Sequence, residues 1–445
     1  MKICNTHNNQ VTGEFVTIAD ERFYAINNVN KMAPFFVSVI SNSDHWLFDW
    51  EPFNREHELR FNITRNLYKN VLGNKLCFEE IHNDLQLAFR YTWATSDTYG
   101  FVRKCELENL SDKPLSVEII DGFQNVLPAG TPRFTQTNSS NLVDAYKWTE
   151  LDESSGLAFF TLFSGITDRA EPCESLKANT VFCLGLDNTN ILLSSEQLSA
   201  FRRGEQVEQE TTKRGIRGAY LVNTTLELKP HSDKKWQFIA NIEQTQSQSV
   251  VLRRQLGERN KLDDNINDSI ANGSDELARI MASVDGFQLT GEESVAEHHY
   301  ANVLFNALRG GIFDDQYQIS ADDFTKTINL FNHKVYQRNQ ALLDSLPEKL
   351  DFVELLTEIK TSGDSQLERL ASEYLPISFG RRHGDPSRPW NQFAIKLVDE
   401  NNKRLLTYQG NWRDIFQNWE ALAHSYPQFI ESMIHKFLNA TTFEG

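Results

Sequence analysis

Short runs of β-branched and aromatic residues recur along the first half of the chain, and clusters of turn-forming residues separate them. Runs of this length and composition, bounded by glycine, proline, asparagine, aspartate or serine, are typical of β-strands. The clearest of them are Phe15–Ile18, Phe35–Ile40, Leu87–Trp93, Phe159–Phe163, Val181–Leu184 and Trp236–Ile242. The pattern therefore predicts that this half of the chain is built from strands.

Two pairs of segments show alternating apolar and polar positions on both sides of a turn. Phe101–Leu110 and Leu115–Ile120 flank the sequence Ser-Asp-Lys-Pro, and Leu221–Leu228 and Trp236–Asn241 flank a charged turn. Alternation on both sides of a short turn predicts an antiparallel hairpin. Because helical periodicity is scarce in this part, we expect residues 1–248 to form a large antiparallel β-sandwich.

The pattern changes near Ser249, where the strand-like runs end and charged residues become frequent. Residues 249–290 contain several aspartates and are interrupted by Asn272-Gly273-Ser274, which predicts a partly helical linker between two domains. Residues 291–445 follow with apolar positions at helical spacing. We expect this last part to be a helical domain.

Helix boundaries in the last part can be placed from capping residues. Glu292–Arg309 is followed by Gly310-Gly311, which is typical of a helix C-terminus. Ser320 precedes two aspartates and an apolar stripe, so a helix is expected to begin after it and to continue to Leu346. Further helices are expected at Asp351–Thr361, Ser365–Tyr374, Arg413–His424 and Gln428–Asn439.

Length and composition restrict the classes of protein to which the chain can belong. Its 445 residues are too many for one ordinary core, and 40% hydrophobic and 24% charged residues are typical of globular proteins. A net charge of −17 argues against nucleic acid or an anionic membrane as a partner, since both require a basic surface. No apolar run reaches the roughly 18 residues of a membrane-spanning helix.

The N-terminal sequence and the cysteines indicate a cytoplasmic location. Residues 1–10 lack the apolar core of a secretory signal. The five cysteines contain no CxxC pair and fit reduced thiols better than a disulfide framework. His298 and His299 have no further ligand at a suitable spacing, so no metal site is expected.

The segment Ile377–His424 carries the densest combination of charged, aromatic and turn-forming residues. Loops held by rigid elements commonly position catalytic and binding side chains. A solvated, glycine-rich connection would carry the same charges, but it would not require Trp390, Trp412 and Trp419. The candidate site residues are Arg381, Arg382, His383, Asp385, Arg388, Trp390, Gln409, Asn411, Trp412, Arg413 and Asp414.

The order of an antiparallel sandwich, a helical linker and paired helices resembles the glycoside phosphorylases of the cellobiose and chitobiose phosphorylase kind. Proteins of this family have an N-terminal super-sandwich, a helical linker and an (α/α)6 barrel, and their site contains an Asp-Trp-Asn-Asp run. The corresponding run here is Asn411-Trp412-Arg413-Asp414. By this resemblance Trp412 contacts the sugar and Asp414 is the general acid, whereas Asn411 and Arg413 differ from the family residues.

The resemblance implies a β super-sandwich followed by the first part of an (α/α)6-like barrel. The implied reaction is inverting phosphorolysis or hydrolysis of a β-linked glycoside, with an oligosaccharide or disaccharide as substrate. It implies no cofactor, although inorganic phosphate would be the co-substrate of a phosphorylase. Because residues 291–445 supply only part of such a barrel, we expect either a fragment of a longer enzyme or a natural half-protein, with a homodimer as a further option.

Each of these roles has an alternative. Asp414 precedes a predicted helix and would be favoured there by the helix dipole alone. The three arginines can clamp a phosphate or a carboxylated sugar, and they can equally form salt bridges with a neighbouring acidic loop. His383 and Tyr408 would transfer protons if the helical part were a lyase or an epimerase. A non-catalytic carbohydrate-binding or assembly fragment is the alternative to an enzyme.

Overall fold

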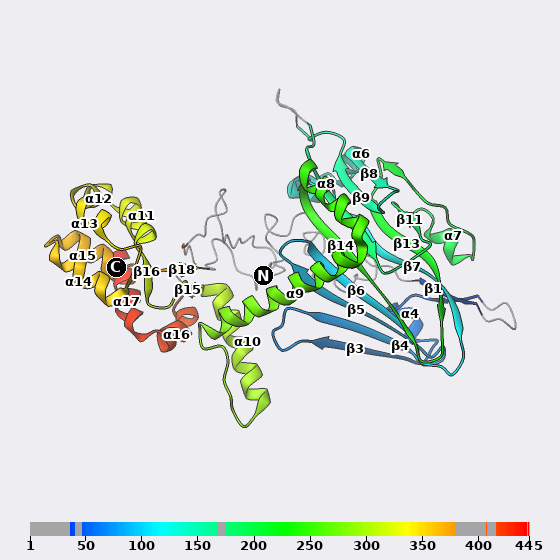
Figure 1. Ribbon diagram of the computed structural model, residues 1–445, viewed down its shortest axis with the longest axis horizontal. Coiled ribbons are helices and arrows are strands. Elements are labelled where there is room, and N and C mark those ends of the chain that lie inside the picture. The colour runs from blue at the N-terminus through cyan, green and yellow to red at the C-terminus, as the bar shows by residue number, and fades with distance from the viewer. Residues whose placement is uncertain are drawn as a thin grey trace. The chain divides into compact units, whose positions relative to one another are not determined.

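The computed structural model describes residues 36–40, 47–167, 174–378, 406, 415–442 and 444. The chain divides into two compact units, Met1–Leu277 (unit 1) and Ala278–Gly445 (unit 2). Unit 1 is mainly β and unit 2 is mainly α (Figure 1). None of the helices in the described ranges is both long and apolar enough to cross a lipid bilayer.

The described strands of unit 1 form two antiparallel sheets. A five-stranded sheet has the order β11-β13-β7-β1-β2, and a nine-stranded sheet has the order β12-β8-β9-β10-β14-β6-β5-β4-β3. The first sheet consists of β1 (Phe36–Ile40), β2 (Leu47–Trp50), β7 (Leu115–Val126), β11 (Asn190–Leu192) and β13 (Gly218–Leu228). The second consists of β3 (Ile63–Lys69), β4 (Leu76–His82), β5 (Leu87–Ser96), β6 (Gly100–Asn109), β8 (Lys147–Asp152), β9 (Leu157–Leu162), β10 (Lys177–Leu184), β12 (Thr212–Arg214) and β14 (Asp233–Thr245). Short helices lie between strands at α4 (Arg55–Glu58), α5 (Arg133–Asn138), α6 (Ser140–Tyr146) and α7 (Leu198–Arg202).

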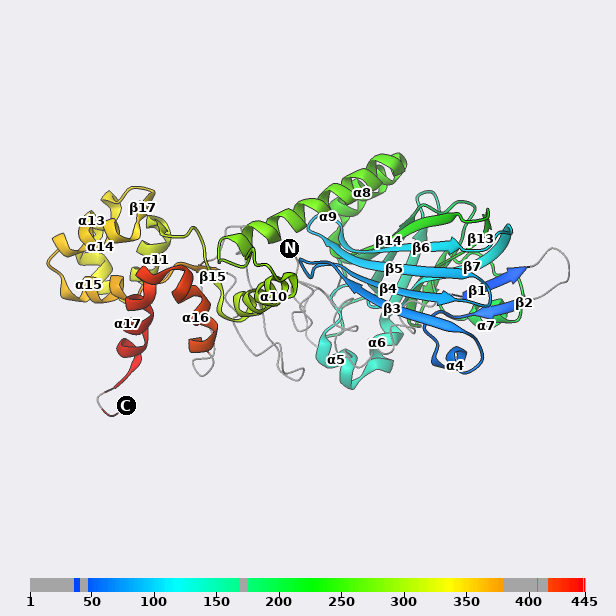
Figure 2. The same ribbon diagram turned by 90° about the horizontal axis from the view of Figure 1, so that it is seen from below.

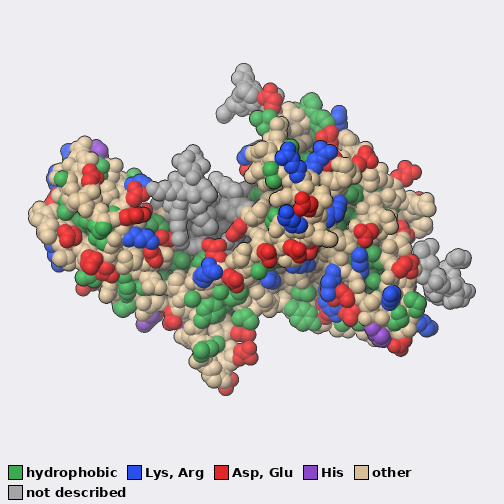
Figure 3. All heavy atoms as spheres, in the orientation of Figure 1, with side chains coloured by type: hydrophobic (Ala, Val, Ile, Leu, Met, Phe, Trp, Pro, Cys, Tyr) green, Lys and Arg blue, Asp and Glu red, His purple; other side chains and the backbone are tan. Residues whose placement is uncertain are grey.

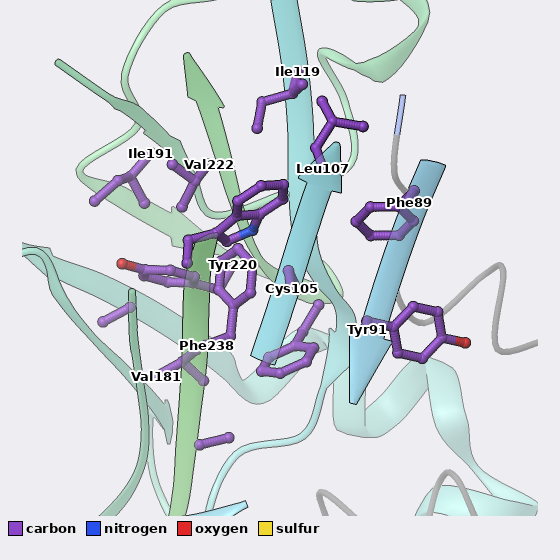
Figure 4. Close-up of a cluster of buried hydrophobic side chains, with 14 of the residues drawn as sticks. Phe89, Tyr91, Cys105, Leu107, Ile119, Val181, Ile191, Tyr220, Val222 and Phe238 are labelled. Carbon is purple, nitrogen blue, oxygen red and sulfur yellow. The ribbon is translucent and has the colours of Figure 1, made fainter. Parts of the chain in front are cut away.

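The two sheets share one hydrophobic core. Alternation along β6 buries Cys105 and Leu107 and leaves Lys104 and Glu106 only half-buried, on the other face. Figure 4 shows side chains of both sheets in this core, among them Phe89, Phe238, Ile119, Tyr220 and Val222. The prediction of a large antiparallel β part is confirmed, while its assignment to the super-sandwich class stays a prediction.

Both predicted hairpins are wrong. β6 and β7 follow each other in sequence but lie in different sheets, and so do β13 and β14. Alternation shows that a strand buries one face, but it does not specify the neighbouring strand. Asn109 forms hydrogen bonds to both of these connections between the sheets. Its Nδ2 donates to the carbonyl oxygen of Lys113, between β6 and β7, at 2.7 Å and to that of Lys229, between β13 and β14, at 3.1 Å.

A buried ion pair joins the two sheets inside the core. Arg103 Nη1 on β6 donates to Asp121 Oδ1 on β7 at 2.9 Å, and both side chains are completely buried. Trp236 Nε1 on β14 donates to the other carboxylate oxygen at 2.8 Å. The guanidinium carbon of Arg103 lies 4.7 Å from the centroid of the Tyr91 ring. Each buried charge is therefore compensated by a close partner.

Two helices cover part of the outer face of the nine-stranded sheet (Figure 2). They are α8 (Gln246–Gln255), which Thr245 begins with a capping box, and α9 (Arg259–Ala282), with a 3-10 turn (Leu256–Glu258) between them. Ile266 and Ile270 of α9 pack with Val102 and Ile239 of the sheet.

The interruption predicted at Asn272-Gly273-Ser274 is wrong, because these residues lie inside the continuous helix α9. Ser274 Oγ donates to the carbonyl oxygen of Ile270 at 3.0 Å and accepts from Asn74 Nδ2 at 2.9 Å. Tertiary contacts of this kind outweigh the weak helix propensity of asparagine and glycine. The domain boundaries at residues 248 and 290 stay predictions of the sequence.

Unit 2 consists of helices and short antiparallel ladders. Its helices are α10 (Glu293–Gly310), α11 (Ala321–Phe331), α12 (His333–Arg338), α13 (Gln340–Ser345), α14 (Phe352–Thr361), α15 (Ser365–Ser372), α16 (Ile415–Ser425) and α17 (Ile430–Ala440), the last preceded by a 3-10 turn (Pro427–Phe429). The ladders pair β15 (Ile312–Phe313) with β18 (Ile377–Ser378) and β16 (Gln318–Ser320) with β17 (Lys349–Asp351). The sequence did not predict these short strands, and the (α/α)6-like arrangement stays a prediction.

Capping residues predicted several helix boundaries correctly. α10 ends before Gly311, whose φ is 81°, and the Ser320 side chain accepts from the backbone of Asp323 to cap α11. The predicted continuation to Leu346 is wrong, because α11 ends at Phe331. The side chain of Asn332 then caps a separate helix, α12.

The connection between α9 and α10 should be the more sensitive of two segments to proteolysis. Residues 287–292 are exposed and have no regular structure, whereas α8 and the first part of α9 pack on the sheet. We therefore expect limited proteolysis to cut within 287–292 before it cuts within 249–274, as mapped by mass spectrometry of the fragments. Earlier cleavage inside α8 or α9 would contradict this packing.

Removal of one partner of the buried ion pair should be strongly destabilising. Arg103→Met leaves the Asp121 charge without compensation, and the expected loss in free energy of unfolding is roughly 3–5 kcal/mol. The double variant Arg103→Met, Asp121→Asn should lose clearly less than the sum of the single losses, as measured by chemical denaturation. Additive losses would show that the two side chains do not stabilise each other.

Candidate active site

The site residues predicted between positions 381 and 414 lie outside the described residues. They are Arg381, Arg382, His383, Asp385, Arg388, Trp390, Tyr408, Gln409, Asn411, Trp412, Arg413 and Asp414. Their roles, including those of Asp414 and Trp412, stay predictions.

The elements on either side of this segment are described, and unit 2 holds both. β18 pairs with β15 and ends at Ser378, whose side chain is buried. After the segment, α16 begins at Ile415 and packs on α10. Trp419 of α16 is 3% exposed, and its ring centroid lies 6.0 Å from that of Phe437. This tryptophan therefore belongs to the helical core.

An aromatic cluster connects the elements before the segment with those after it. The ring centroid of Phe429 lies 4.3 Å from that of Phe313, 4.5 Å from Phe352 and 5.4 Å from Tyr317. Tyr426 lies edge-on to Phe313 at 5.3 Å. Because Phe313, Phe352 and Phe429 are buried, the cluster is a packing core and not an open platform for sugars.

A hydrogen-bonded carboxyl and phenol lie in the same unit. Asp323, in the first turn of α11, accepts from Tyr374 Oη at 2.6 Å. Tyr374 is 3% exposed, and its ring packs edge-on against Phe324 at a centroid distance of 5.1 Å. The helix cap at Ser320 and this aromatic contact together fix the position of the carboxyl.

Burial and neighbouring charges change the proton affinity of both groups. Burial raises the pKa of Asp323, the hydrogen bond from Tyr374 lowers it, and the charges of Asp322 and Asp314 raise it again, with a net upward shift. Burial also raises the pKa of Tyr374, and the charges of Asp323 and Asp314 add to that shift. Asp323 therefore holds its proton to a higher pH than an exposed aspartate does. A carboxyl with this property can act as a proton donor, provided that a substrate reaches it.

The sequence placed Asp323 at a helix N-terminus and did not connect it with Tyr374. The two residues lie 51 positions apart, and no local motif links them. A tyrosine near the end of a helix gives no indication in the sequence that it binds a distant carboxyl. Within the described ranges, no group of three or more His, Cys, Asp or Glu side chains is arranged to hold a metal ion.

Residues 313–376 match the model of glycoside hydrolase family 149 insertion domain 1. The match begins in β15, ends just before β18 and includes both Asp323 and Tyr374. No curated protein matches the chain. The chain thus contains a segment of a kind that is known as an insertion in a glycoside hydrolase family.

Solved structures with partial similarity to the chain include three carbohydrate-active proteins. A bacterial glucoamylase in complex with acarbose has 10% identity and a TM-score of 0.36, over 70% of this chain and 43% of its own. A protein assigned as a kojibiose phosphorylase, from the human microbiome, has 9% identity and a TM-score of 0.31, over 88% of this chain and 45% of its own. A family GH92 α-mannosidase from Bacteroides thetaiotaomicron has 11% identity and a TM-score of 0.31, over 65% of this chain and 34% of its own. The chain spans less than half the length of each, and TM-scores of this size support no inference about fold or function.

The raised pKa of Asp323 predicts how stability depends on pH. A carboxyl that binds its proton more tightly in the folded state loses stabilisation as pH rises above its unfolded pKa of about 3.9. Asp323→Asn removes this term and keeps an acceptor for Tyr374. We therefore expect the melting temperature of the variant, relative to the natural protein, to rise between pH 4 and pH 7.

Glu354→Gln is the matched control, because Glu354 lies exposed in the first turn of another helix of unit 2, α14, and the substitution removes one negative charge as well. Its difference from the natural protein should vary much less with pH. If both variants show the same pH dependence, Asp323 is not the carboxyl with the raised pKa.

Proposed function

We propose that this protein is carbohydrate-active and takes part in the cleavage of a β-linked glycoside. The observation that carries the proposal is the match of residues 313–376 to an insertion domain of a glycoside hydrolase family. The order of a β unit followed by a helical unit, and the run Asn411-Trp412-Arg413-Asp414 soon after the matched segment, support it. The substrate would be an oligosaccharide or disaccharide.

In this proposal Asp414 protonates the departing sugar oxygen. The apolar ring of Trp412 would lie beside it, contact a sugar ring and raise the pKa of the acid by desolvation. An inverting hydrolase places a second carboxylate roughly 6.5–9.5 Å away to activate water, whereas in a phosphorylase inorganic phosphate is the nucleophile and one acid is sufficient.

The remaining residues of the segment would bind substrate. Guanidinium groups suit phosphate and carboxylate, and amide and indole groups suit sugar hydroxyls and faces. The proposed binding residues are Arg381, Arg382, His383, Asp385, Arg388, Trp390, Gln409, Asn411 and Arg413. The reaction requires no cofactor beyond inorganic phosphate as a co-substrate.

The role of Asp414 can be tested through the leaving group. Asp414→Asn keeps the size of the side chain but removes the transferable proton, and a general acid contributes roughly 100- to 10,000-fold to the rate. With a sugar or alkyl leaving group the rate should fall by this factor. A glycoside with an acidic phenol as leaving group needs less protonation and should be affected much less.

Trp412→Ala is the control for this experiment. It should weaken sugar binding without changing the dependence on the leaving group, because a stacking ring transfers no proton. Equal rate losses of Asp414→Asn for both leaving groups would remove Asp414 from the catalytic role. A helix-capping aspartate would instead cost stability, roughly 0.5–1 kcal/mol, with no leaving-group dependence.

A further inference from the structure

Unit 1 contains a cavity between the outer face of the nine-stranded sheet and helix α9. Its volume is about 720 Å³, within the range of small-molecule sites. The floor is a row of side chains on adjacent strands, in which Thr92 of β5 lies opposite Lys104 of β6, and Lys104 lies opposite Gln237 of β14. The wall is formed by Asp263 and Asn267 of α9, among others.

The cavity begins where the side chains on the outer face of the sheet change from apolar to polar. Toward one end of the strands, Val102 and Ile239 are apolar and α9 covers them. Two residues further along the same strands, the outward positions become Lys104 and Gln237. Figure 3 shows basic and acidic side chains interspersed on the displayed face of unit 1. The lining of the cavity is likewise mixed, with basic and acidic side chains.

Two of the carboxylates around the cavity already have partners. Asp263 Oδ1 accepts from Gln237 Nε2, and Asp263 Oδ2 accepts from Asn267 Nδ2 at 3.1 Å. Glu106 is paired with Arg90 at 2.9 Å and with Lys235 at 3.4 Å. A third carboxylate, Asp264, also lines the cavity, but it is exposed, so water screens its charge.

Two other polar groups of the cavity are incompletely paired. Lys104 is half-buried and donates to Asn267 Oδ1, but no carboxylate oxygen of the described residues lies within 4.0 Å of its Nζ. Gln237 is 5% exposed, and its Oε1 has no hydrogen-bond donor in the described structure. Since the bond to Asp263 fixes the orientation of this amide, its oxygen stays the acceptor that is left without a donor.

The surroundings of Lys104 disfavour its own positive charge. Burial lowers the pKa of Lys104, repulsion by Lys75 lowers it further, and Asp263 opposes this with a smaller effect. Lys75 precedes β4 and, by strand alternation, is on the same face as Cys77, which lines the cavity. A half-buried ammonium group that donates to an amide oxygen and is repelled by a second lysine would be stabilised by an added negative charge.

We propose that this cavity binds a small hydroxylated anion, that is, a phosphorylated or carboxylated sugar. Its anionic group would lie on Lys104 and Lys75, and one of its hydroxyls would donate to Gln237 Oε1. A fully ionised inorganic anion such as sulfate supplies no donor to Gln237, and a neutral sugar supplies no charge to the lysines. The inference does not depend on the reaction proposed above, since every residue of the cavity lies in unit 1.

Calorimetric titration of the whole protein can test the ligand class with four probes: glucose 6-phosphate, glucuronate, glucose and sulfate. We expect one or both of the sugar anions to bind at least about tenfold more tightly than glucose or sulfate. Binding of glucose 6-phosphate alone would identify phosphorylated sugars as the source, and binding of glucuronate alone would identify carboxylated ones. The proposal would be overturned if neither sugar anion bound more tightly than both glucose and sulfate.

Variants locate the site. Lys104→Gln should weaken binding of the sugar anion at least about tenfold, and Lys75→Gln should weaken it severalfold. Lys177→Gln is the matched control, because Lys177 lies exposed on β10, is paired with Glu243 and changes the net charge equally. Equal losses in Lys104→Gln and Lys177→Gln would mean that only the overall charge matters, which would contradict the site.

A footprint of lysine acetylation by mass spectrometry gives a second readout that does not require a variant to fold. The sugar anion should protect Lys104 and Lys75 from acetylation and leave Lys177 unprotected. Asp414→Asn should leave the protection of Lys104 and Lys75 unchanged, so failure of this site and failure of the proposed reaction are separately observed. Protection of Lys177 to the same extent, or no protection of Lys104, would overturn the proposal.

Discussion

The arrangement of unit 1 depends on a charge buried between its two sheets. Arg103 comes from the nine-stranded sheet and Asp121 from the five-stranded sheet, so their ion pair holds the facing sheets in one register. The backbone beside Asp121 is equally constrained, because a Cβ at Gly122 would lie 1.9 Å from the carbonyl oxygen of Tyr220. A buried ion pair is a weak source of stability but penalises any arrangement that separates its charges. We infer that its main effect here is to select one packing of the sheets.

The same register determines what the outer face of the nine-stranded sheet presents. Once Arg103 and Cys105 point into the core, alternation turns Lys104 and Glu106 outward. On β14 the inward Trp236 likewise leaves Gln237 on the outer face, opposite Lys104. The polar cavity beside α9 is thus a consequence of how the core is packed, and a shift of one residue in β6 would remove it.

Local sequence signals predicted local features such as helix ends. They failed for features that depend on contacts between residues distant in sequence, such as strand pairing. The cap at Ser320, the helix in the range Asp351–Thr361 and the end of α10 at Gly311 were predicted, because each depends on a few neighbouring residues. Strand partners were not, since alternation is the same for a hairpin and for a crossing between two sheets. The break at Asn332 was missed because the apolar stripe continues on both sides of it.

The candidate site was also predicted from local signals and not from distant contacts. Turn residues, charges and tryptophans marked the segment from residue 377 to residue 424, and the elements at its two ends, β18 and α16, lie in unit 2. The hydrogen bond between Asp323 and Tyr374 joins positions 51 residues apart, and only the fold brings them together. Trp419, which counted as evidence for a binding loop, belongs instead to the helical core.

We propose that the segment between β18 and α16 forms the sugar site. The most direct measurement is photo-crosslinking of the whole protein with a β-linked oligosaccharide that carries a diazirine, followed by peptide mapping with mass spectrometry. The account predicts labelled peptides within residues 377–424, with labelling suppressed by excess unlabelled oligosaccharide. Labelling confined to unit 1, or labelling of residues 377–424 that excess oligosaccharide does not suppress, would contradict it.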